Sequence, residues 1–296
     1  MSSKPDDATP TAAHRNRKAT HMLPRLPFGV AATAGIALLL TACAPQEPER
    51  VEAEMPSLGH VHAIITDPVT GQTLLGTHDG LVTVNDDGTI SDRVGGHGFD
   101  AMGLAAAGEA LIASGHPGSS TPAEWGSPHL GFIRSEDGGQ SWAPVAYTGE
   151  KDFHALAAGP SDELYGLSTD DPALLTSIDG GVTWMPTGAA LAAYALAVDA
   201  AGVVYATTPD GVRVSVDAGA TFEDFPGAPP LYLVNTSPDH TELAGVDVSG
   251  GIWRAATDDA SWLQVGTAVG QAQAVTITAS GDIAIVDDSG YHVLPE

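Results

Sequence analysis

Cysteine and positive charge are both scarce in this sequence. Its 296 residues include one cysteine and 11 lysines and arginines, against 37 acidic residues, and the formal net charge is −26. A single thiol excludes a scaffold held by internal disulfides and a zinc ribbon built on cysteines. So few cations cannot neutralise a phosphate backbone, and we therefore predict no nucleic-acid partner.

Charged residues are few overall, whereas glycine and proline are abundant. Charged side chains make up 16% of the chain and hydrophobic ones 43%, a balance that excludes a chain disordered throughout. The 35 glycines and 21 prolines argue against a helical bundle. They favour many short strands joined by turns.

An apolar run near the N-terminus, residues 28–40, has only 13 residues and is too short to span a bilayer comfortably. Basic residues precede it, as in a secretory signal: Arg15, Arg17, Lys18 and Arg25. The run ends in Leu40-Thr41-Ala42-Cys43, which resembles the lipobox of bacterial lipoproteins. This resemblance implies that Cys43 becomes the first residue of the mature protein and carries a lipid. Met1 and Met22 are alternative starts of this signal.

The sequence thus divides into three predicted regions. Residues 1–42 are a lipoprotein signal peptide, residues 43–57 are a lipidated tether, and residues 58–296 are the folded domain. The signal segment carries five basic and two acidic residues, so the exported chain keeps 6 basic and 35 acidic ones and a net charge of −29. We expect a protein outside the cytoplasm, anchored to the cell membrane by the lipid on Cys43.

One turn sequence recurs along the folded region. Three segments match S-x-D-x-G-x-[ST]-[WF], and their aspartates are 42 and 38 residues apart, a spacing typical of four-stranded propeller blades. We predict a structural role for these residues: the aspartate accepts N–H bonds in a tight turn, the glycine permits positive φ, and the aromatic ring packs between sheets. The residues are Ser135, Asp137, Gly139, Trp142, Ser177, Asp179, Gly181, Trp184, Ser215, Asp217, Gly219 and Phe222.

Apolar runs that could start a blade indicate how many blades there are. Aligned with one another, they begin at six positions: His62, Met102, His154, Tyr194, Tyr232 and Ala274. We therefore predict an all-β fold, a six-bladed β-propeller of four-stranded antiparallel blades. Only three strands follow in the last blade, so residues 51–55 are expected to supply its fourth strand and close the ring.

The recurring turn resembles the Asp-box of BNR-repeat β-propellers, the sialidase and sortilin-like superfamily. Segments such as His60-Val61-His62 and Asp152-Phe153-His154 are similar to those of bacterial lipoproteins labelled glycosyl hydrolase. Fold alone does not imply an activity. A true sialidase is excluded because that family holds its substrate carboxylate with three arginines, and three do not remain on the substrate side here.

Histidines gather in the first half of the folded region, where seven of the 11 lie between residues 60 and 154. Propeller topology would bring several to one face, at the starts of inner strands and the ends of second strands. Imidazole is a common metal ligand, and an added thioether favours copper over zinc. The predicted ligands are His62, Met102, His154, His78 and His116. The alternative is that these side chains line the channel and bond to carbonyls and water.

Three functions remain open at this point. The leading hypothesis is a non-catalytic binding or assembly module for a protein or glycan ligand, with a copper or zinc site on the channel face. The second is a glycoside hydrolase that uses Asp79, Asp100 or Asp170 as paired carboxylates. An insertion at residues 116–130 could then supply Trp125 and Glu124 as a lid, or be an ordinary surface loop. The third is a metal-free protein-interaction platform.

Overall fold

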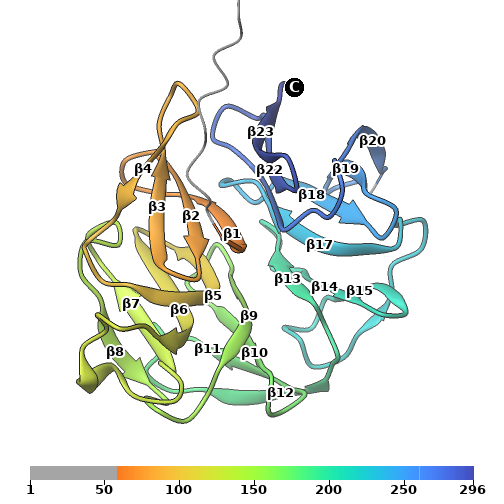
Figure 1. Cartoon of the computed structure of the whole chain (residues 1–296). Helices are drawn as coiled ribbons and strands as arrows, with labels where there is room; N and C mark the ends of the chain where they lie inside the picture. The colour runs from red at the N-terminus through yellow and green to blue at the C-terminus, as the bar shows by residue number, and fades with distance from the viewer. Residues whose placement is uncertain (1–58, 260) are drawn as a thin grey trace, which may run out of the picture. The chain divides into compact units, whose positions relative to one another are not determined.

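A computed structural model describes residues 59–259 and 261–296, and its strands form six antiparallel sheets around a central channel (Figure 1). The strands of the first three blades run outward in chain order. Blade 1 contains β1 (Val61–Thr66), β2 (Thr73–Thr77), β3 (Gly80–Val84) and β4 (Ile90–Arg93). Blade 2 contains β5 (Phe99–Ala107), β6 (Ala110–Pro117), β7 (Phe132–Ser135) and β8 (Ala143–Ala146), with a 3-10 helix η1 (Ala123–Trp125) between β6 and β7. Blade 3 contains β9 (Phe153–Ala158), β10 (Leu164–Ser168), β11 (Ala173–Ser177) and β12 (Met185–Ala190).

The second half of the chain repeats this arrangement. Blade 4 contains β13 (Ala195–Val198), β14 (Val204–Thr208), β15 (Gly211–Ser215) and β16 (Glu223–Asp224). Blade 5 contains β17 (Leu231–Thr236), β18 (Glu242–Asp247), β19 (Gly251–Ala256) and β20 (Leu263–Thr267). Blade 6 contains β21 (Ala274–Ile277), β22 (Ile283–Asp287) and β23 (Gly290–Leu294). The prediction of a six-bladed antiparallel propeller is confirmed, with four strands in blades 1 to 5 and three in blade 6 among the described residues.

The first and last blades pack against each other. Val61 and Ile64 of β1 form one buried cluster with Ala284 and Val286 of β22. The Gln273 side chain adds a polar link, because its Oε1 accepts the Val61 N–H at 2.8 Å. The predicted closing strand, residues 51–55, lies outside the described residues, and so do the signal segment and Cys43. Among the residues that the structure describes, no helix is long and apolar enough to cross a membrane.

Aromatic side chains fill the space between consecutive sheets. Trp184, from the recurring turn of blade 3, stacks on Phe153 with ring centroids 5.1 Å apart and meets Phe132 of blade 2 edge-on, also at 5.1 Å. The Trp142 ring packs edge-on against Phe99 of β5 at 5.5 Å. These rings join the aliphatic core of each sheet to the next one, so neighbouring blades share their buried surface.

The recurring turns form the same hydrogen-bond network in blades 2, 3 and 4. In blade 3, the Ser177 hydroxyl donates to Asp179 Oδ1 at 2.8 Å and accepts the Gly181 N–H at 3.0 Å. Asp179 in turn accepts the Thr183 N–H at 2.9 Å. Gly181 has φ near +90°, and a Cβ there would lie 2.0 Å from the Phe132 ring. The aspartate therefore holds the turn closed while the glycine lets it pack against the neighbouring blade.

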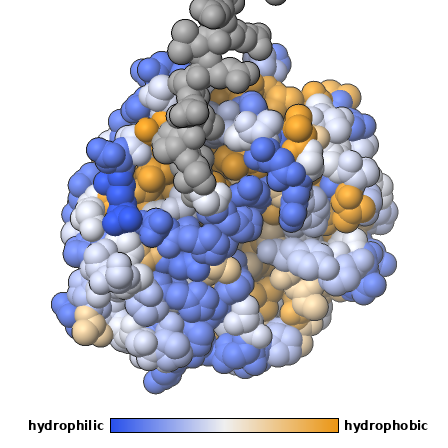
Figure 2. Space-filling view, viewed as in Figure 1, coloured by the Kyte–Doolittle hydropathy of each residue, from blue (hydrophilic) through white to orange (hydrophobic). Residues whose placement is uncertain are grey.

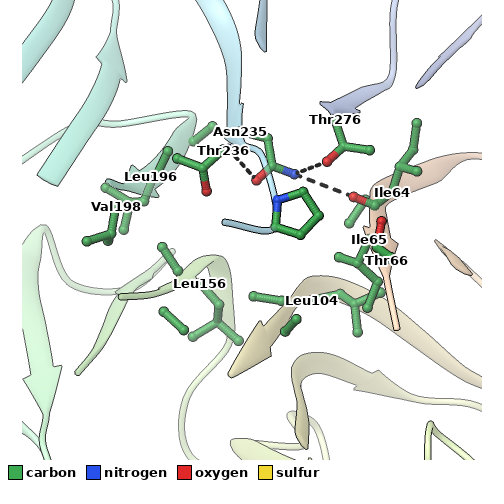
Figure 3. A pocket seen from close by; sticks show the side chains of 18 of the residues that line it. Ile64, Ile65, Thr66, Leu104, Leu156, Leu196, Val198, Asn235, Thr236 and Thr276 are labelled. Atoms are coloured by element: carbon green, nitrogen blue, oxygen red, sulfur yellow. Dashed lines mark hydrogen bonds between the residues drawn. The ribbon is translucent and has the colours of Figure 1, made fainter. Parts of the chain in front are cut away.

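The innermost strands line a channel of about 630 Å³. Aliphatic side chains such as Leu104, Leu156 and Leu196 point into it (Figure 3). Asn235 of β17 reaches across: its amide nitrogen lies 3.4 Å from the Ile64 carbonyl oxygen and 3.3 Å from Thr276 Oγ1. This side chain links blades 5, 6 and 1 within the channel.

Candidate functional site

Irregular strand starts place the predicted site residues at one mouth of the channel. The β1–β2 register shifts between Val61 and Ala63, so His62 sits at a bulge, and a similar shift in the β9–β10 pair places His154 at one. In β5 the shift falls between Asp100 and Gly103 and includes Met102. Bulges re-aim side chains away from the regular alternation of a strand. His62, Met102 and His154 all line the channel, as the sequence predicts.

Three side chains from blades 1 and 2 converge at this mouth, and we call them the mouth triad: His62, His78 and Asp100. Asp100 Oδ1 lies 3.1 Å from His62 Nε2 and 2.9 Å from His78 Nδ1, and the two nitrogens are 3.4 Å apart. The carboxylate oxygen is buried, yet neither imidazole meets it in hydrogen-bond geometry. The three atoms that could bind a metal ion, two imidazole nitrogens and one carboxylate oxygen, thus form a nearly equilateral triangle.

Burial controls the charge of His62 within the mouth triad. Loss of solvent lowers the pKa of His62 to about 4, although the nearby Asp100 carboxylate opposes this shift. The His62 imidazole is therefore neutral near pH 7 and keeps a lone pair for a ligand bond. His60 stands beside it, with ring centroids 4.7 Å apart.

The surface that is visible over blades 1 to 3 is largely hydrophilic (Figure 2).

A second cluster lies between blades 2 and 3, and we call it the loop triad: His116, His129 and Asp152. One ligand atom from each of these residues lies within 4.8 Å of the others. The Asp152 side chain is only 5% exposed. Burial alone would raise its pKa, but the hydrogen bond from His154 and the nearby imidazoles outweigh burial and lower it. Asp152 is therefore anionic near neutral pH.

His116 connects the two triads. It faces Asp100 across the β5–β6 pair, so the two side chains are cross-strand neighbours. Its Nδ1 lies 3.6 Å from Asp100 Oδ2, and its Nε2 lies 3.2 Å from Asp152 Oδ2. His154 Nε2 approaches the same Asp152 oxygen at 2.7 Å. One chain of contacts therefore runs from blade 1 to blade 3.

Two of the three carboxylates in the hydrolase hypothesis, those of Asp79 and Asp170, are exposed and lie beside cations. The Asp79 side chain is 88% exposed and lies 3.8 Å from Arg93, and Asp170 is 58% exposed and lies 3.7 Å from Lys151. A hydrogen bond from Ser168 leads the effects that lower the pKa of Asp170, which opposes a role as general acid. Asp100 has the carboxylate of Asp152 on the other side of the His116 ring.

The insertion between β6 and β7 is anchored to the protein by its tryptophan. Trp125 is 4% exposed and packs against His97 and Phe99, with ring centroids 5.2 and 6.0 Å away. A ring buried in this way cannot stack on a sugar, whereas Glu124 stays exposed. Trp125 therefore anchors the insertion instead of acting as a lid.

Sequence reasoning missed two members of the loop triad. Asp152 stands next to the blade 3 start, but its partners come from blade 2, two strands away in the chain. His129 belongs to the insertion and has no counterpart in the other blades, so alignment of the blades could not place it. The histidine spacing did signal the region, because every histidine between residues 60 and 154 has a contact with another histidine or with Trp125 at this mouth.

Comparison with known proteins identifies the fold. No protein-family model and no curated protein matches the chain. A Bacteroides thetaiotaomicron protein of unknown function is 12% identical with a TM-score of 0.56, over 80% of this chain and 70% of its own. The Niastella koreensis GH74 enzyme is 16% identical with a TM-score of 0.52, over 77% and 40%. The extracellular domain of a hybrid two-component system from B. thetaiotaomicron is 12% identical with a TM-score of 0.52, over 83% and 33%. The chain spans less than half the length of the last two, and these likenesses show a β-propeller fold.

Proposed function

We propose that this protein is a membrane-anchored binding module outside the cytoplasm, whose propeller holds a transition-metal ion at the mouth triad. The carrying observation is the triangle of donor atoms from His62, His78 and Asp100, with edges of 2.9, 3.1 and 3.4 Å. Ligand atoms around a tetrahedral ion with bonds of 2.0–2.1 Å lie roughly 3.3 Å apart. The triangle therefore matches one face of such a site.

The donor set indicates which metals would bind. Two imidazole nitrogens and a carboxylate oxygen suit Zn²⁺ or Cu²⁺ better than Cu⁺, which prefers sulfur. Met102 follows Asp100 by two residues and lines the channel, and a thioether ligand from it would favour copper. His78 is 52% exposed, which leaves the open side of the triangle accessible to an incoming ion and a fourth ligand.

The anchor and the family are parts of the same proposal. Residues 1–42 would be removed as a signal, and residues 43–57 would tether the propeller to a lipid on Cys43. The extracellular location of one structural neighbour supports export of the domain. The Ser-Asp-Gly hydrogen-bond network of three blades supports kinship with BNR-repeat propellers.

Metal analysis tests the binding site. The full chain, purified in detergent and stripped with a chelator, is titrated with Zn²⁺ and Cu²⁺ beside His62→Ala and His78→Ala variants. Loss of a residue that only supports a metal ligand weakens metal affinity by up to about 100-fold. Loss of a ligand itself should weaken metal binding at the mouth triad by at least as much. His292→Ala is the matched control, because His292 also stands beside an aspartate, Asp287, at 3.5 Å. Equal binding by wild type and both mouth variants would refute the site.

A glycoside hydrolase is the second candidate. The observation in its favour is the pair Asp100 and Asp152, two carboxylates on opposite sides of the His116 ring. Paired carboxylates are the usual machinery of glycoside hydrolysis. A screen of glycan substrates with wild type and Asp100→Asn decides between the candidates, since only the enzyme would show turnover that the variant loses. If the protein shows neither metal binding nor turnover, the protein-interaction platform is the function that remains.

A further inference from the structure

We infer that the loop triad is a second, separate cation site, built by the insertion between β6 and β7 and selective for a divalent transition metal. His116 comes from β6, His129 from the insertion, and Asp152 from the residue before β9. An ion held there would join blade 2 to blade 3, whereas one at the mouth triad would join blade 1 to blade 2. This site stands on its own observations and does not need the mouth triad to be occupied.

Backbone bonds on both sides hold the insertion in place around His129. The Leu130 N–H donates to the Gly115 carbonyl at 2.8 Å, and the Gly149 N–H donates to the His129 carbonyl at 2.9 Å. The buried ring of Trp125 fixes the other end of the loop. The His129 side chain is therefore positioned by structure on each flank, as a preorganised ligand requires.

Two buried polar atoms in this cluster have no hydrogen-bond partner. They are Asp152 Oδ1 and His129 Nδ1, and neither meets a donor or acceptor among the described residues. A buried polar atom without a partner destabilises the folded protein, and more so where the group is charged. The Asp152 side chain is 95% buried, so a cation between the two atoms would satisfy both at once.

The remaining oxygen of Asp152 is already held. His154 Nε2 contacts Oδ2 at 2.7 Å, while Oδ1 has no hydrogen-bond partner among the described residues. Carboxylates that bind metals are commonly fixed in this way by a hydrogen bond to the other oxygen. His154, which sequence reasoning placed among the ligands, thus acts as a positioning residue for Asp152.

Stoichiometry tests the loop site. The chelator-stripped full chain is titrated with Zn²⁺ by calorimetry, with metal analysis of the protein after gel filtration. We expect two ions per chain for wild type, one for His129→Ala and one for His78→Ala. Co²⁺ substitution adds an absorption signature whose intensity should fall by about half in each variant, in step with the ion count. The matched control is again His292→Ala, which should keep both ions.

Each result assigns the failure to one proposal. If His129→Ala still binds two ions, the loop site is refuted. If the wild type binds a single ion and only His78→Ala loses it, the loop site is refuted and the mouth site stands. A single ion lost only in His129→Ala would support the loop site and refute the mouth site. His129→Gln, which keeps a polar side chain in the loop, repeats the measurement if His129→Ala fails to fold.

Discussion

At the scale of single residues, glycines allow the chain to pass close to the site. Gly115 has φ near +141°, and a Cβ there would lie 1.9 Å from the Asp100 carbonyl oxygen. It stands one residue before His116, whose partner across the strand pair is Asp100. Ser114 adds a bond to the next blade, because its hydroxyl accepts the Phe153 N–H at 2.9 Å. The close backbone contact at Gly115 thus helps to position Asp100 of the mouth triad beside His116 of the loop triad.

Replacing Gly115 by alanine should weaken metal binding at both triads. The new methyl group must push Asp100 away, and displacement of a supporting contact typically costs 10–100-fold in metal affinity, so we expect a loss on the order of tenfold or more. The measurement is Zn²⁺ titration of the full chain. Gly211→Ala is the control, since Gly211 also has positive φ, near +120°, but nothing lies within 4 Å of its Cβ position. Unchanged affinity in Gly115→Ala would contradict the role of this contact.

At the scale of elements, the recurring turn and the aromatic ring that follows it join each blade to the previous one. Trp184 is 9% exposed, its ring meets two phenylalanines, and its Nε1 donates to the Gly181 carbonyl at 2.8 Å. The carboxylate of each turn is held by hydroxyl and N–H donors. The same residues therefore support both the turn and the packing between blades.

Trp184→Ala should destabilise the propeller by about 3–5 kcal/mol, because the deletion leaves a large cavity between blades 2 and 3. Denaturant unfolding measures this change. Met185→Ala serves as the control one residue further on, where the side chain is 62% exposed, and its effect should be small. A Trp184→Ala protein as stable as wild type would show that the ring is not part of the shared core.

Acid should loosen the recurring turns between about pH 4 and pH 2. Hydrogen bonds from Thr221 and Ser215 lower the pKa of Asp217 to about 2, and Thr183 leads the bonds that lower the pKa of Asp179. A folded-state pKa below the unfolded value of about 3.9 gives stability that is present above that value and lost as the pH falls through the folded one. Thermal unfolding across this pH range should show that the melting temperature of Asp217→Asn falls less steeply with decreasing pH than that of the wild type.

The control for the acid measurement is Asp86→Asn, because the Asp86 carboxylate accepts no hydrogen bond among the described residues. Its melting temperature should follow that of the wild type at each pH. If Asp217→Asn and Asp86→Asn lose stability in parallel, the turn carboxylates do not contribute to the acid sensitivity.

At the scale of the whole molecule, six sheets share one channel, and the ends of the described chain meet through blades 1 and 6. Val61 packs against the last blade, and Asn235 reaches from blade 5 to Ile64 of blade 1. Residues 43–296 carry a net charge of −29, which favours solubility and attracts cations to the domain. The proposed metal sites would lie in this negative field.

Cys43→Ser should release the protein from the membrane, because it removes the only residue proposed to carry a lipid. Fractionation of cells that express the full chain would then find the variant in the soluble fraction and the wild type in the membrane fraction. Thermal unfolding of the two proteins should agree, since the substitution changes none of the residues 61–294 that form the described strands. A variant that stays with the membrane would refute the lipid anchor.

The sequence by itself determined the architecture. Evenly spaced turns with serine, aspartate and glycine, and apolar runs between them, are local signals, so the six blades and their antiparallel order followed from periodicity. It also predicted a candidate site at one end of the channel, because histidines begin two of the six aligned apolar runs. Periodicity could not show which side chains meet. His62, His78 and Asp100 converge because bulges turn strand starts away from regular alternation, and no repeat spacing encodes a bulge. Asp152 and His129 joined the site only through packing of the insertion against blade 3, a contact between segments that share no pattern.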